Sequence, residues 1–499
     1  MEVILSVLGY CCNIRFVALC FAGSLAGLFV GSIPGLSVSM ATALLVSITY
    51  TWTATDAMAT IMGVYVVGVF SGALSAILIN IPGAPSSVVT TLDGHPLANK
   101  GEAFKALKYA TIYSFIGSLF GIIALAVLAK PITSLALKFQ PMDYFLLALF
   151  GLATVGSLTS KSFSKGLISA LLGVFIAMIG LDSVVGTPRL TFGIQGLKAG
   201  VSTVPALVGL FGFAEVLSVV SDGFGDGEVN KLTKMVVKTK DILKEFWHSM
   251  YYCVIGTVVG ALPGAGGPVA AFLAYSEAKR IVKNPSVPFG EGAVEGLVAS
   301  ESANNACIGG ALIPMLTLAI PGDAVTAIIL SVFYVHGLQP GPNFLKTSAS
   351  SFYAILAGGI LGCVFLLILG LLVAPYISRV IAVPKRILLP IVTVLCVIGA
   401  YACNNRLFDV ALMFIFGVGG YLLRRRGYSV APVTLGLVLG SMMDSNFRRA
   451  VSLASSSDNF VVAMFGRPIT IVLTALTVIT ILSNIPAVKA LFSKKKAAE

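Results

Sequence analysis

Charged residues are scarce in this chain of 499 residues, since Asp, Glu, Lys and Arg together make up only 11% of it. A soluble domain usually contains about 25% charged residues. Hydrophobic residues make up 57%, and the mean hydropathy is +0.96. The composition therefore excludes an ordinary soluble protein and predicts a membrane protein that crosses the bilayer several times.

Residues that build catalytic and metal sites are also few. The three histidines, His95, His248 and His336, stand far apart, and the eight cysteines show no paired CxxC spacing. A zinc site or a nucleophile with its base requires such residues in clusters. We therefore expect no enzyme, no cofactor and no structural metal, and an intramembrane enzyme stays only as a remote alternative.

Acidic residues are outnumbered, with 21 Asp and Glu against 33 Lys and Arg, which gives a formal net charge of +12. Basic clusters beside apolar stretches are typical of loops that face anionic lipid headgroups, rather than of nucleic-acid binding. We expect the lipid bilayer as a partner, no nucleic acid, a cytoplasmic C-terminus and a cytoplasmic loop over 223–246. The clusters are Lys100/Lys105/Lys108, Lys231–Lys244, Lys279/Arg280/Lys283, Arg424–Arg426 and Lys494–Lys496.

Long apolar stretches, by contrast, run through nearly the whole sequence. Many reach the roughly 17–25 residues that a helix needs to cross a bilayer. We therefore predict an all-α polytopic membrane protein with about 10–14 transmembrane segments. The first apolar run, near 16–33, has no basic n-region and no small-residue cleavage site before it, so we expect a retained helix and not a removed signal peptide.

Four Pro-Gly sequences interrupt the apolar stretches, two in each half of the chain. They are GSIPGLS at 31–37, NIPGAPSS at 80–87, GALPGAGG at 260–267 and AIPGDAVT at 319–326. Proline removes a backbone donor, and in hydrocarbon each freed amide costs several kcal/mol unless another group satisfies it. Breaks at matching places in two halves therefore indicate a function.

The breaks also relate the two halves to each other. Pro34 matches Pro263 at an offset of 229, and Pro82 matches Pro321 at an offset of 239. Interrupted helices at corresponding places in two repeats are the best sequence indicator of a transporter's binding site. We predict an N-terminal transmembrane repeat over 1–220, a polar cytoplasmic linker over 221–249, a C-terminal transmembrane repeat over 250–490 and a basic tail over 491–499.

The residues after each break are suited to an anion. A helix that restarts after Pro-Gly presents free N–H groups and the positive end of its dipole. Small and hydroxylated residues there let a ligand reach the backbone, although Gly and Pro also serve simply to kink and pack membrane helices. The predicted substrate site comprises Pro34, Gly35, Ser37, Asn80, Pro82, Gly83, Ser86, Ser87, Pro263, Gly264, Gly266, Pro321, Gly322 and Thr326.

Few ionisable residues lie within the apolar stretches, where a charge is costly unless it faces a cavity or a partner. Glu301, Asn304 and Asn305 are three and four residues apart on a helix, so they can face one cavity and bind Na⁺, bind substrate hydroxyls or tie helices together. Asp323 follows the fourth break and either caps the new helix or binds a cation. Asp93 is predicted to be a turn residue. The predicted cation site comprises Asn80, Glu301, Asn304, Asn305 and Asp323.

Longer motifs around these residues point to a family. They are ILINIPGAPSSVVTTLDGHPLANKGEAFKAL at 77–107, GALPGAGGPVAAFLAYSEAKR at 260–280, and 289–342, which contains ESANNACIGGALIPMLTLAIPGDAVT. Over nearly its full length the chain resembles the large membrane subunit of the bacterial tripartite tricarboxylate transporters. The resemblance implies an inner-membrane importer of small carboxylates that works with a small membrane subunit and a periplasmic solute-binding protein.

From the residues and the resemblance together we expect secondary active import of a tricarboxylate such as citrate, or of a dicarboxylate. A cation gradient would drive it, with Na⁺ favoured over H⁺ as the coupling ion. A passive anion channel or uniporter remains as an alternative, because broken helices can also build a pore.

Overall fold

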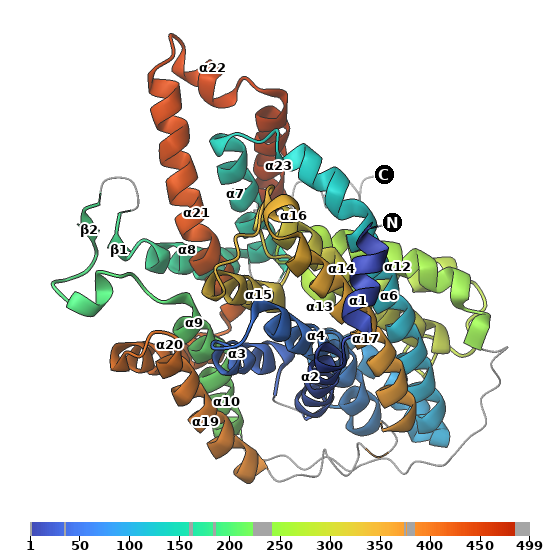
Figure 1. Ribbon diagram of the computed structural model, residues 1–499. Helices are drawn as coiled ribbons and strands as arrows, with labels where there is room; N and C mark the ends of the chain where they lie inside the picture. The colour runs from blue at the N-terminus through green and yellow to red at the C-terminus, as the bar shows by residue number, and fades with distance from the viewer. Residues whose placement is uncertain are drawn as a thin grey trace.

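The computed structural model describes residues 2–33, 36–158, 163–182, 186–222, 242–373, 376 and 385–484, and these form a helical assembly (Figure 1). The strands within them are β1 (Gly180–Leu181) and β2 (Pro188–Arg189), which pair antiparallel. Six of the described helical segments are long and apolar enough to cross a membrane, and five shorter apolar helices accompany them. The predicted fold class, an all-α polytopic membrane protein, is confirmed.

The N-terminal half contains most of its residues in helices, including short 3₁₀ and π segments. In chain order they are α1 (Glu2–Cys11), α2 (Ile14–Ser32), α3 (Val38–Ile48), α4 (Ala54–Ile79), η1 (Pro85–Ser87), α5 (Val88–Leu97), η2 (Ala98–Glu102), α6 (Ala103–Ala136), α7 (Pro141–Leu158), α8 (Phe163–Ala177), η3 (Gln195–Leu197), α9 (Thr203–Leu207), η4 (Val208–Phe213) and α10 (Ala214–Asp222).

The C-terminal half continues with α12 (Phe246–Ala261), α13 (Gly266–Ile281), α14 (Val294–Leu318), α15 (Ala324–Val335), α16 (Phe344–Thr347), α17 (Ala349–Leu372), α19 (Lys385–Ala402), α20 (Leu407–Arg425), α21 (Val430–Ser455), α22 (Phe460–Phe465) and α23 (Pro468–Asn484). The series α12, α13, α14 and α15 follows the same order of helix and break as α2, α3, α4 and α5. Of the predicted boundaries, the linker residues 223–241 and the tail 491–499 lie outside the described residues, and the division into two repeats stays a prediction.

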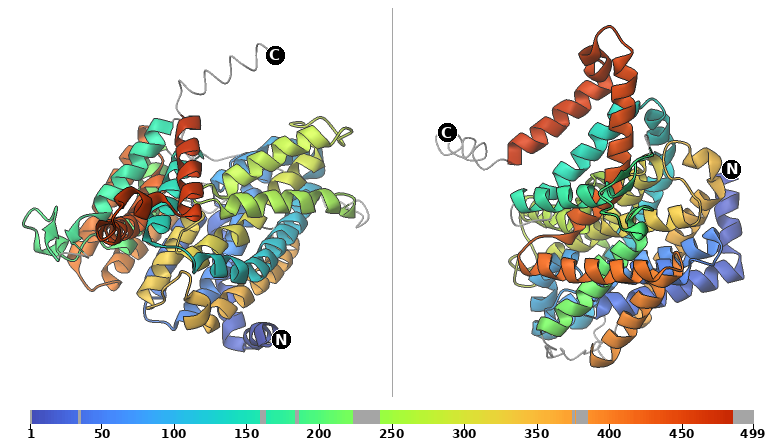
Figure 2. Two further views of the ribbon diagram at one scale, coloured as in Figure 1. Left: turned by 90° about the horizontal axis from the view of Figure 1, so that it is seen from above. Right: turned by 90° about the vertical axis from the view of Figure 1, so that its left-hand side faces the viewer.

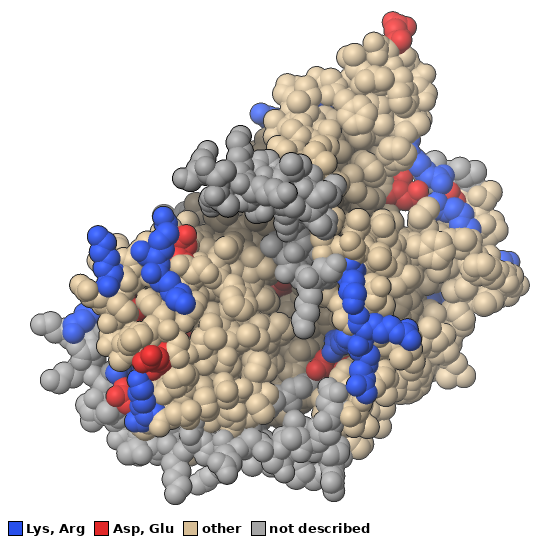
Figure 3. Space-filling model, turned by 180° about the vertical axis from the view of Figure 1, so that it is seen from behind, with Lys and Arg blue, Asp and Glu red and all other residues tan. Residues whose placement is uncertain are grey.

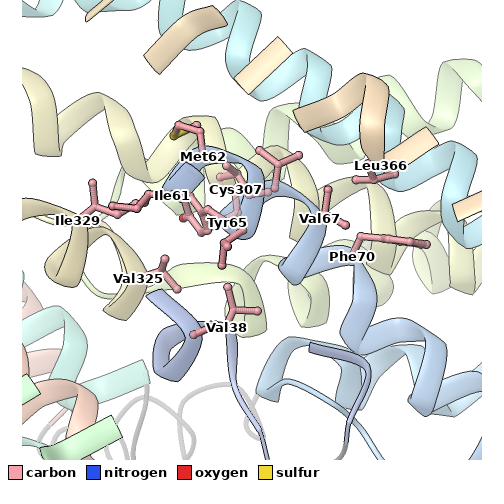
Figure 4. Packing of buried hydrophobic residues seen from close by; sticks show 14 of the residues in the cluster. Val38, Ile61, Met62, Tyr65, Val67, Phe70, Cys307, Val325, Ile329 and Leu366 are labelled. Atoms are coloured by element: carbon pink, nitrogen blue, oxygen red, sulfur yellow. The ribbon is translucent and has the colours of Figure 1, made fainter. Parts of the chain in front are cut away.

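Helices α4 and α14 lie at the centre of the assembly. Helix α2 packs along α4 and α12 packs along α14, while α4 also contacts α17 and α14 contacts α6. Glycines allow the backbones to approach, since a methyl group on Gly27 would lie 2.7 Å from the carbonyl oxygen of Val64, and one on Gly260 would lie 2.5 Å from that of Cys307. Close contact through small residues is typical of helix pairs in membranes. Figure 4 shows the core around Tyr65 and Cys307.

The outer faces of the helices carry apolar side chains, and the charged ones gather in a few places. Figure 3 shows Lys and Arg grouped on a surface that is otherwise made mostly of uncharged residues. The views in Figure 2 show α21, α22 and α23 forming an arm that extends from the rest of the helices. Exposed large apolar residues, such as Ile14, Val127 and Ile479, are what the hydrocarbon region requires of a membrane protein.

Candidate functional site

The second and fourth breaks have the same backbone geometry. Helix α4 ends at Asn80 with φ 57°, and α14 ends at Ala319 with φ 58°, and each is followed by Ile-Pro-Gly. Asn adopts this left-handed conformation more readily than Ala does, so the conformation gives a structural reason for asparagine here. The predicted ligand Asn80 itself is exposed at this cap.

Gly83 and Gly322 bring these two breaks against the helices that precede the other two. A methyl group on Gly83 would overlap the carbonyl oxygen of Gly31 and lie 2.9 Å from Cα of Gly72. One on Gly322 would overlap the carbonyl oxygen of Gly260 and lie 2.6 Å from Cα of Ala311. Each pair of breaks is therefore packed together through a position where a side chain does not fit.

The first and third breaks restart as α3 and α13. Ser37 is the N-cap of α3, where its side chain accepts a hydrogen bond from the amide of Met40 at 3.1 Å. Pro34 and Gly35 lie outside the described residues. At the third break, Gly264 has φ 73° and Gly266 has φ 63°, so glycine provides the left-handed turn before α13. Pro263 is buried there.

The second, third and fourth breaks meet at the start of α13. A methyl group on Gly267 would overlap Oδ1 of Asn304 and lie 3.3 Å from Cβ of Ser86. A methyl group on the neighbouring Gly266 would lie 3.2 Å from Cβ of Asp323. The structure therefore brings the substrate candidates Ser86 and Gly266 and the cation candidates Asn304 and Asp323, from both halves of the chain, to one place. We call Ser86, Ser87, Gly266, Gly267 and Asn304 the central site.

Two polar side chains of the central site are buried without a partner. The Asn304 side chain is 3% exposed, and neither its Nδ2 nor its Oδ1 hydrogen-bonds within the described part of the chain. Oγ of Ser87 is likewise buried and unpaired among the described residues. Each such group costs about 1–3 kcal/mol when left unsatisfied. This cost is repaid if a ligand with polar atoms binds at the start of α13.

Asp323 caps α15, as one of its two predicted roles requires. Its Oδ1 accepts a hydrogen bond from the amide of Thr326 at 2.7 Å, and Thr326 Oγ1 accepts one from the amide of Asp323 at 2.9 Å. Its Oδ2 accepts a third from the buried hydroxyl of Tyr65 at 2.8 Å. Figure 4 shows Tyr65 on α4 close to Val325 of α15. The carboxylate therefore joins α15 to the central helix α4. Pro321 and Gly322 are buried, while Pro82 is half-buried.

Glu301 and Asn305 belong to a different polar network. Oε1 of Glu301 accepts a hydrogen bond from Thr90 at 2.5 Å, and Oε2 accepts one from Ser114 at 2.8 Å. Asn305 donates to Ser114 at 2.9 Å and accepts from Ser118 at 3.3 Å. All partners recorded for this buried carboxylate among the described residues are neutral. The structure thus separates Glu301 and Asn305, which face α5 and α6, from Asn304, which faces α13.

Asp93 is not a turn residue, and that prediction is wrong. It lies on α5, and its Oδ1 accepts hydrogen bonds from the amides of Gly290, Gly292 and Ala293 at 2.8, 2.9 and 2.7 Å. Gly290 and Gly292 have φ values of 94° and 105°, so glycine lets the loop before α14 fold its amides around one oxygen. The glycine pair in FGEGAV is the sequence signal that indicates this loop.

The fold and the central site together define a class. The chain is a polytopic all-α membrane protein in which interrupted helices from two halves of the sequence meet at buried polar groups, an architecture typical of secondary transporters. The model of the family described as "Tripartite tricarboxylate transporter TctA family" matches residues 17–435. The chain belongs to this family and is therefore a membrane subunit of a tripartite tricarboxylate transporter, so the family expected from the motifs is confirmed.

Two relatives come from Agrobacterium vitis. The chain is 35% identical over 437 residues, 87% of each protein, to one named "Uncharacterized 52.8 kDa protein in TAR-I ttuC' 3'region". It is 39% identical over 199 residues, 40% of this chain and 82% of the relative, to one named "Uncharacterized protein in TAR-II ttuC' 3'region". No solved structure matches the chain.

Proposed function

We propose that this chain is the translocating subunit of a secondary active importer that moves a small carboxylate across the bacterial inner membrane. The cargo is a tricarboxylate such as citrate, or a dicarboxylate, and a cation gradient, with Na⁺ rather than H⁺, drives its uptake. A periplasmic binding protein delivers the substrate, and a small membrane subunit completes the complex. Membership of a tripartite transporter family supports this assignment.

The observation that carries the proposal is the unpaired amide of Asn304 beside the start of α13. An anionic carboxylate there would accept hydrogen bonds from Nδ2 of Asn304 and from the amides of Gly266 and Gly267 in the first turn of α13. The positive end of the α13 dipole favours the same charge. Gly267 carries no side chain, so Oδ1 of Asn304 lies directly against the start of α13, where a methyl group would overlap it.

A coupling cation would bind close to this carboxylate. Oδ1 of Asn304 is an unused oxygen ligand, and Cβ of Asp323 lies against the neighbouring Gly266, so this hydrogen-bonded carboxylate adds negative charge nearby. Main-chain carbonyls freed at the breaks are typical Na⁺ ligands in transporters of this architecture. Glu301 and Asn305 hydrogen-bond to α5 and α6, on a face of α14 that points away from α13, so we assign them to positioning α14 against those two helices.

Alternating access would change the contacts that cross between the two halves. Helix α13 of the second half lies against η1 and α5 of the first half, and α3 of the first half lies against α15 of the second. A ligand held between η1 and α13 therefore bridges the two halves. Relative movement of these elements would expose it first to one side of the membrane and then to the other.

Uptake into proteoliposomes tests this function. The chain is reconstituted with its small subunit and binding protein, and radiolabelled di- and tricarboxylates are added with and without an inward Na⁺ gradient. We expect one acid to accumulate and its accumulation to collapse without the gradient. Accumulation that follows a proton gradient instead would reject Na⁺ as the coupling ion. Equilibration under every gradient would reject active transport in favour of a passive channel.

Two neighbouring asparagines provide a matched pair of variants for the site. Asn304→Ala removes an amide that makes no hydrogen bond among the described residues, so we expect a stable protein with uptake lost. Asn305→Ala removes partners of Ser114 and Ser118, so we expect a loss of stability of about 1–3 kcal/mol. Normal uptake by a folded Asn304→Ala protein would reject the central site as the binding site.

A further inference from the structure

The second and fourth breaks differ at the residue that opens the following helix. Four residues after the left-handed cap at Asn80 stands Ala84, and four residues after the matching cap at Ala319 stands Asp323. Each is the N-cap of the helix that restarts there, and each has an extended backbone, with φ −139° and −149°. The two positions therefore match in backbone conformation, but only the second carries a side-chain carboxylate.

In the second half, both oxygens of the Asp323 carboxylate accept hydrogen bonds from hydroxyl groups. Oδ1 accepts one from the Thr326 hydroxyl at 2.7 Å, in addition to the one from the Thr326 amide. Oδ2 accepts one from the Tyr65 hydroxyl at 2.8 Å. Because Tyr65 belongs to α4 of the first half, this carboxylate is held between the two halves of the chain.

The corresponding groups in the first half have no partner. Ser87 stands three residues after its N-cap, as Thr326 does. Asn304 stands on α14 fifteen residues before the cap of that helix, as Tyr65 does on α4. The Ser87 hydroxyl and both polar atoms of the Asn304 amide are buried without a hydrogen bond among the described residues. The two unpaired groups of the central site are therefore the counterparts of the two side chains that bind the Asp323 carboxylate.

The unpaired groups lie at the helix start that Ala84 opens. A methyl group on Gly72 would lie 2.7 Å from Oγ of Ser87 and 3.1 Å from Cβ of Ala84, so both atoms border the same point. The Asn304 amide lies where α13 packs on η1. Because η1 leads directly into α5, the positive end of the dipole of this longer helix favours an anion there. Ala84 itself is partly exposed.

We propose that a carboxylate of the substrate binds beside Ala84 and accepts hydrogen bonds from the Ser87 hydroxyl and the Asn304 amide. It takes the place that the Asp323 carboxylate takes in the other half. Ala84 is thus a specificity-determining residue, because the substrate supplies the carboxylate that this position lacks. The inference rests on the proposed function, to which it adds a second contact for the substrate: the two N–H groups of Asn304 serve one carboxylate at each helix start.

Ala84→Asp tests the inference without any substrate. The introduced carboxylate would be held as that of Asp323 is, so we expect the purified full chain in detergent to unfold about 2 °C higher than the wild type. In an Asn304→Ala background the same substitution should raise the unfolding temperature about half as much, because one of the two donors is missing. Equal gains in the two backgrounds would overturn the proposal, and so would a lower unfolding temperature of Ala84→Asp.

Ser429→Asp is the matched control for Ala84→Asp. Ser429 is the N-cap of α21, with an extended backbone, partial exposure and no side-chain capping hydrogen bond. A carboxylate there stabilises the protein through the helix N-terminus alone. We therefore expect the same gain in unfolding temperature with and without Asn304.

Uptake provides a second comparison. Ala84→Asp fills the site with its own side chain, so it should accumulate none of the di- or tricarboxylate that the wild type takes up, whereas Ser429→Asp should keep wild-type uptake. Normal uptake by a folded Ala84→Asp protein would overturn the proposal. If the wild type accumulates none of these acids, the proposed function fails, and the unfolding temperatures still decide this inference.

Acetate provides a measurement that holds even where Ala84→Asp fails to fold. The unfolding temperature of the wild type is measured in sodium acetate and in sodium chloride at equal ionic strength. We expect saturating acetate to raise it by about 1 °C more than chloride does. The shift should be at most half as large in Ser87→Ala, which removes a hydroxyl without a recorded partner. Equal acetate shifts in the wild type and Ser87→Ala would overturn the proposal.

Discussion

Asp93 offers a prediction whose size follows from the structure. Three backbone amides of the loop before α14 donate to its Oδ1, and those of Gly292 and Ala293 do so in buried surroundings. Asp93→Ala leaves these two buried amides without a partner, at a cost of about 1–3 kcal/mol each, so we expect a loss of about 2–6 kcal/mol. Asp93→Asn keeps an acceptor oxygen but removes its negative charge, so we expect a loss of stability of about 1 kcal/mol for each hydrogen bond.

Thermal unfolding of the full chain in detergent measures this loss. A thiol-reactive dye reports unfolding, because Cys253 and Cys307 are buried in the folded protein and react when it opens. We expect stability to decrease from wild type to Asp93→Asn to Asp93→Ala. Uptake should fall in the same order, because η1, which contains Ser86 and Ser87 of the central site, leads directly into α5 and moves with it. The control is Asp458→Ala, an exposed aspartate. Equal unfolding temperatures for Asp93→Ala and Asp458→Ala would refute the reasoning.

The glycine positions and the α15 cap give two further predictions. Gly83→Ala and Gly322→Ala should each lower the free energy of unfolding by about 1–3 kcal/mol and abolish most uptake, because the added methyl group overlaps a backbone carbonyl. Gly9→Ala, the control, should change neither stability nor uptake. Wild-type unfolding temperatures for both Gly83→Ala and Gly322→Ala would show that the breaks do not pack as described. Asp323→Ala should lose the cap and leave the Tyr65 hydroxyl unpaired, about 2–4 kcal/mol in thermal unfolding. Asp323→Asn should keep most of that stability but weaken the Na⁺ dependence of uptake, and an unchanged Na⁺ titration would remove Asp323 from the cation site.

The fold class and the breaks could be predicted from sequence because they depend on local properties. Apolar length identifies membrane helices, and Pro-Gly forbids an uninterrupted helix wherever it falls. The left-handed cap at Asn80 is indicated by its residue type, but the same cap at Ala319 is indicated only by its match in the other half. The internal similarity of the sequence therefore carries information that residue preferences alone do not.

The partners of individual polar groups could not be predicted, because they depend on which helices surround α14. At about 100° per residue, Asn305 lies about 40° to one side of Glu301 and Asn304 about 60° to the other. Both asparagines could share a face with Glu301 as far as spacing is concerned. Contacts of α14 with α6 on one side and with α13 on the other determine which groups each asparagine meets, and spacing along α14 does not reveal these contacts. The turn prediction for Asp93 is wrong for the same reason, since its amide partners lie 197, 199 and 200 residues away in sequence.

The contrast between Glu301 and Asn304 explains why one helix can both hold the site and bind a ligand. Glu301 is fully hydrogen-bonded to α5 and α6, so this face of α14 fixes the surrounding helices in place. Asn304, on the neighbouring face, keeps both of its polar atoms unpaired within the described chain. Satisfied polar networks rigidify a protein, whereas an unsatisfied buried amide lowers the free energy only when a ligand arrives. A rigid face therefore holds an unsatisfied one in position, so that binding energy goes to the ligand and not to ordering the site.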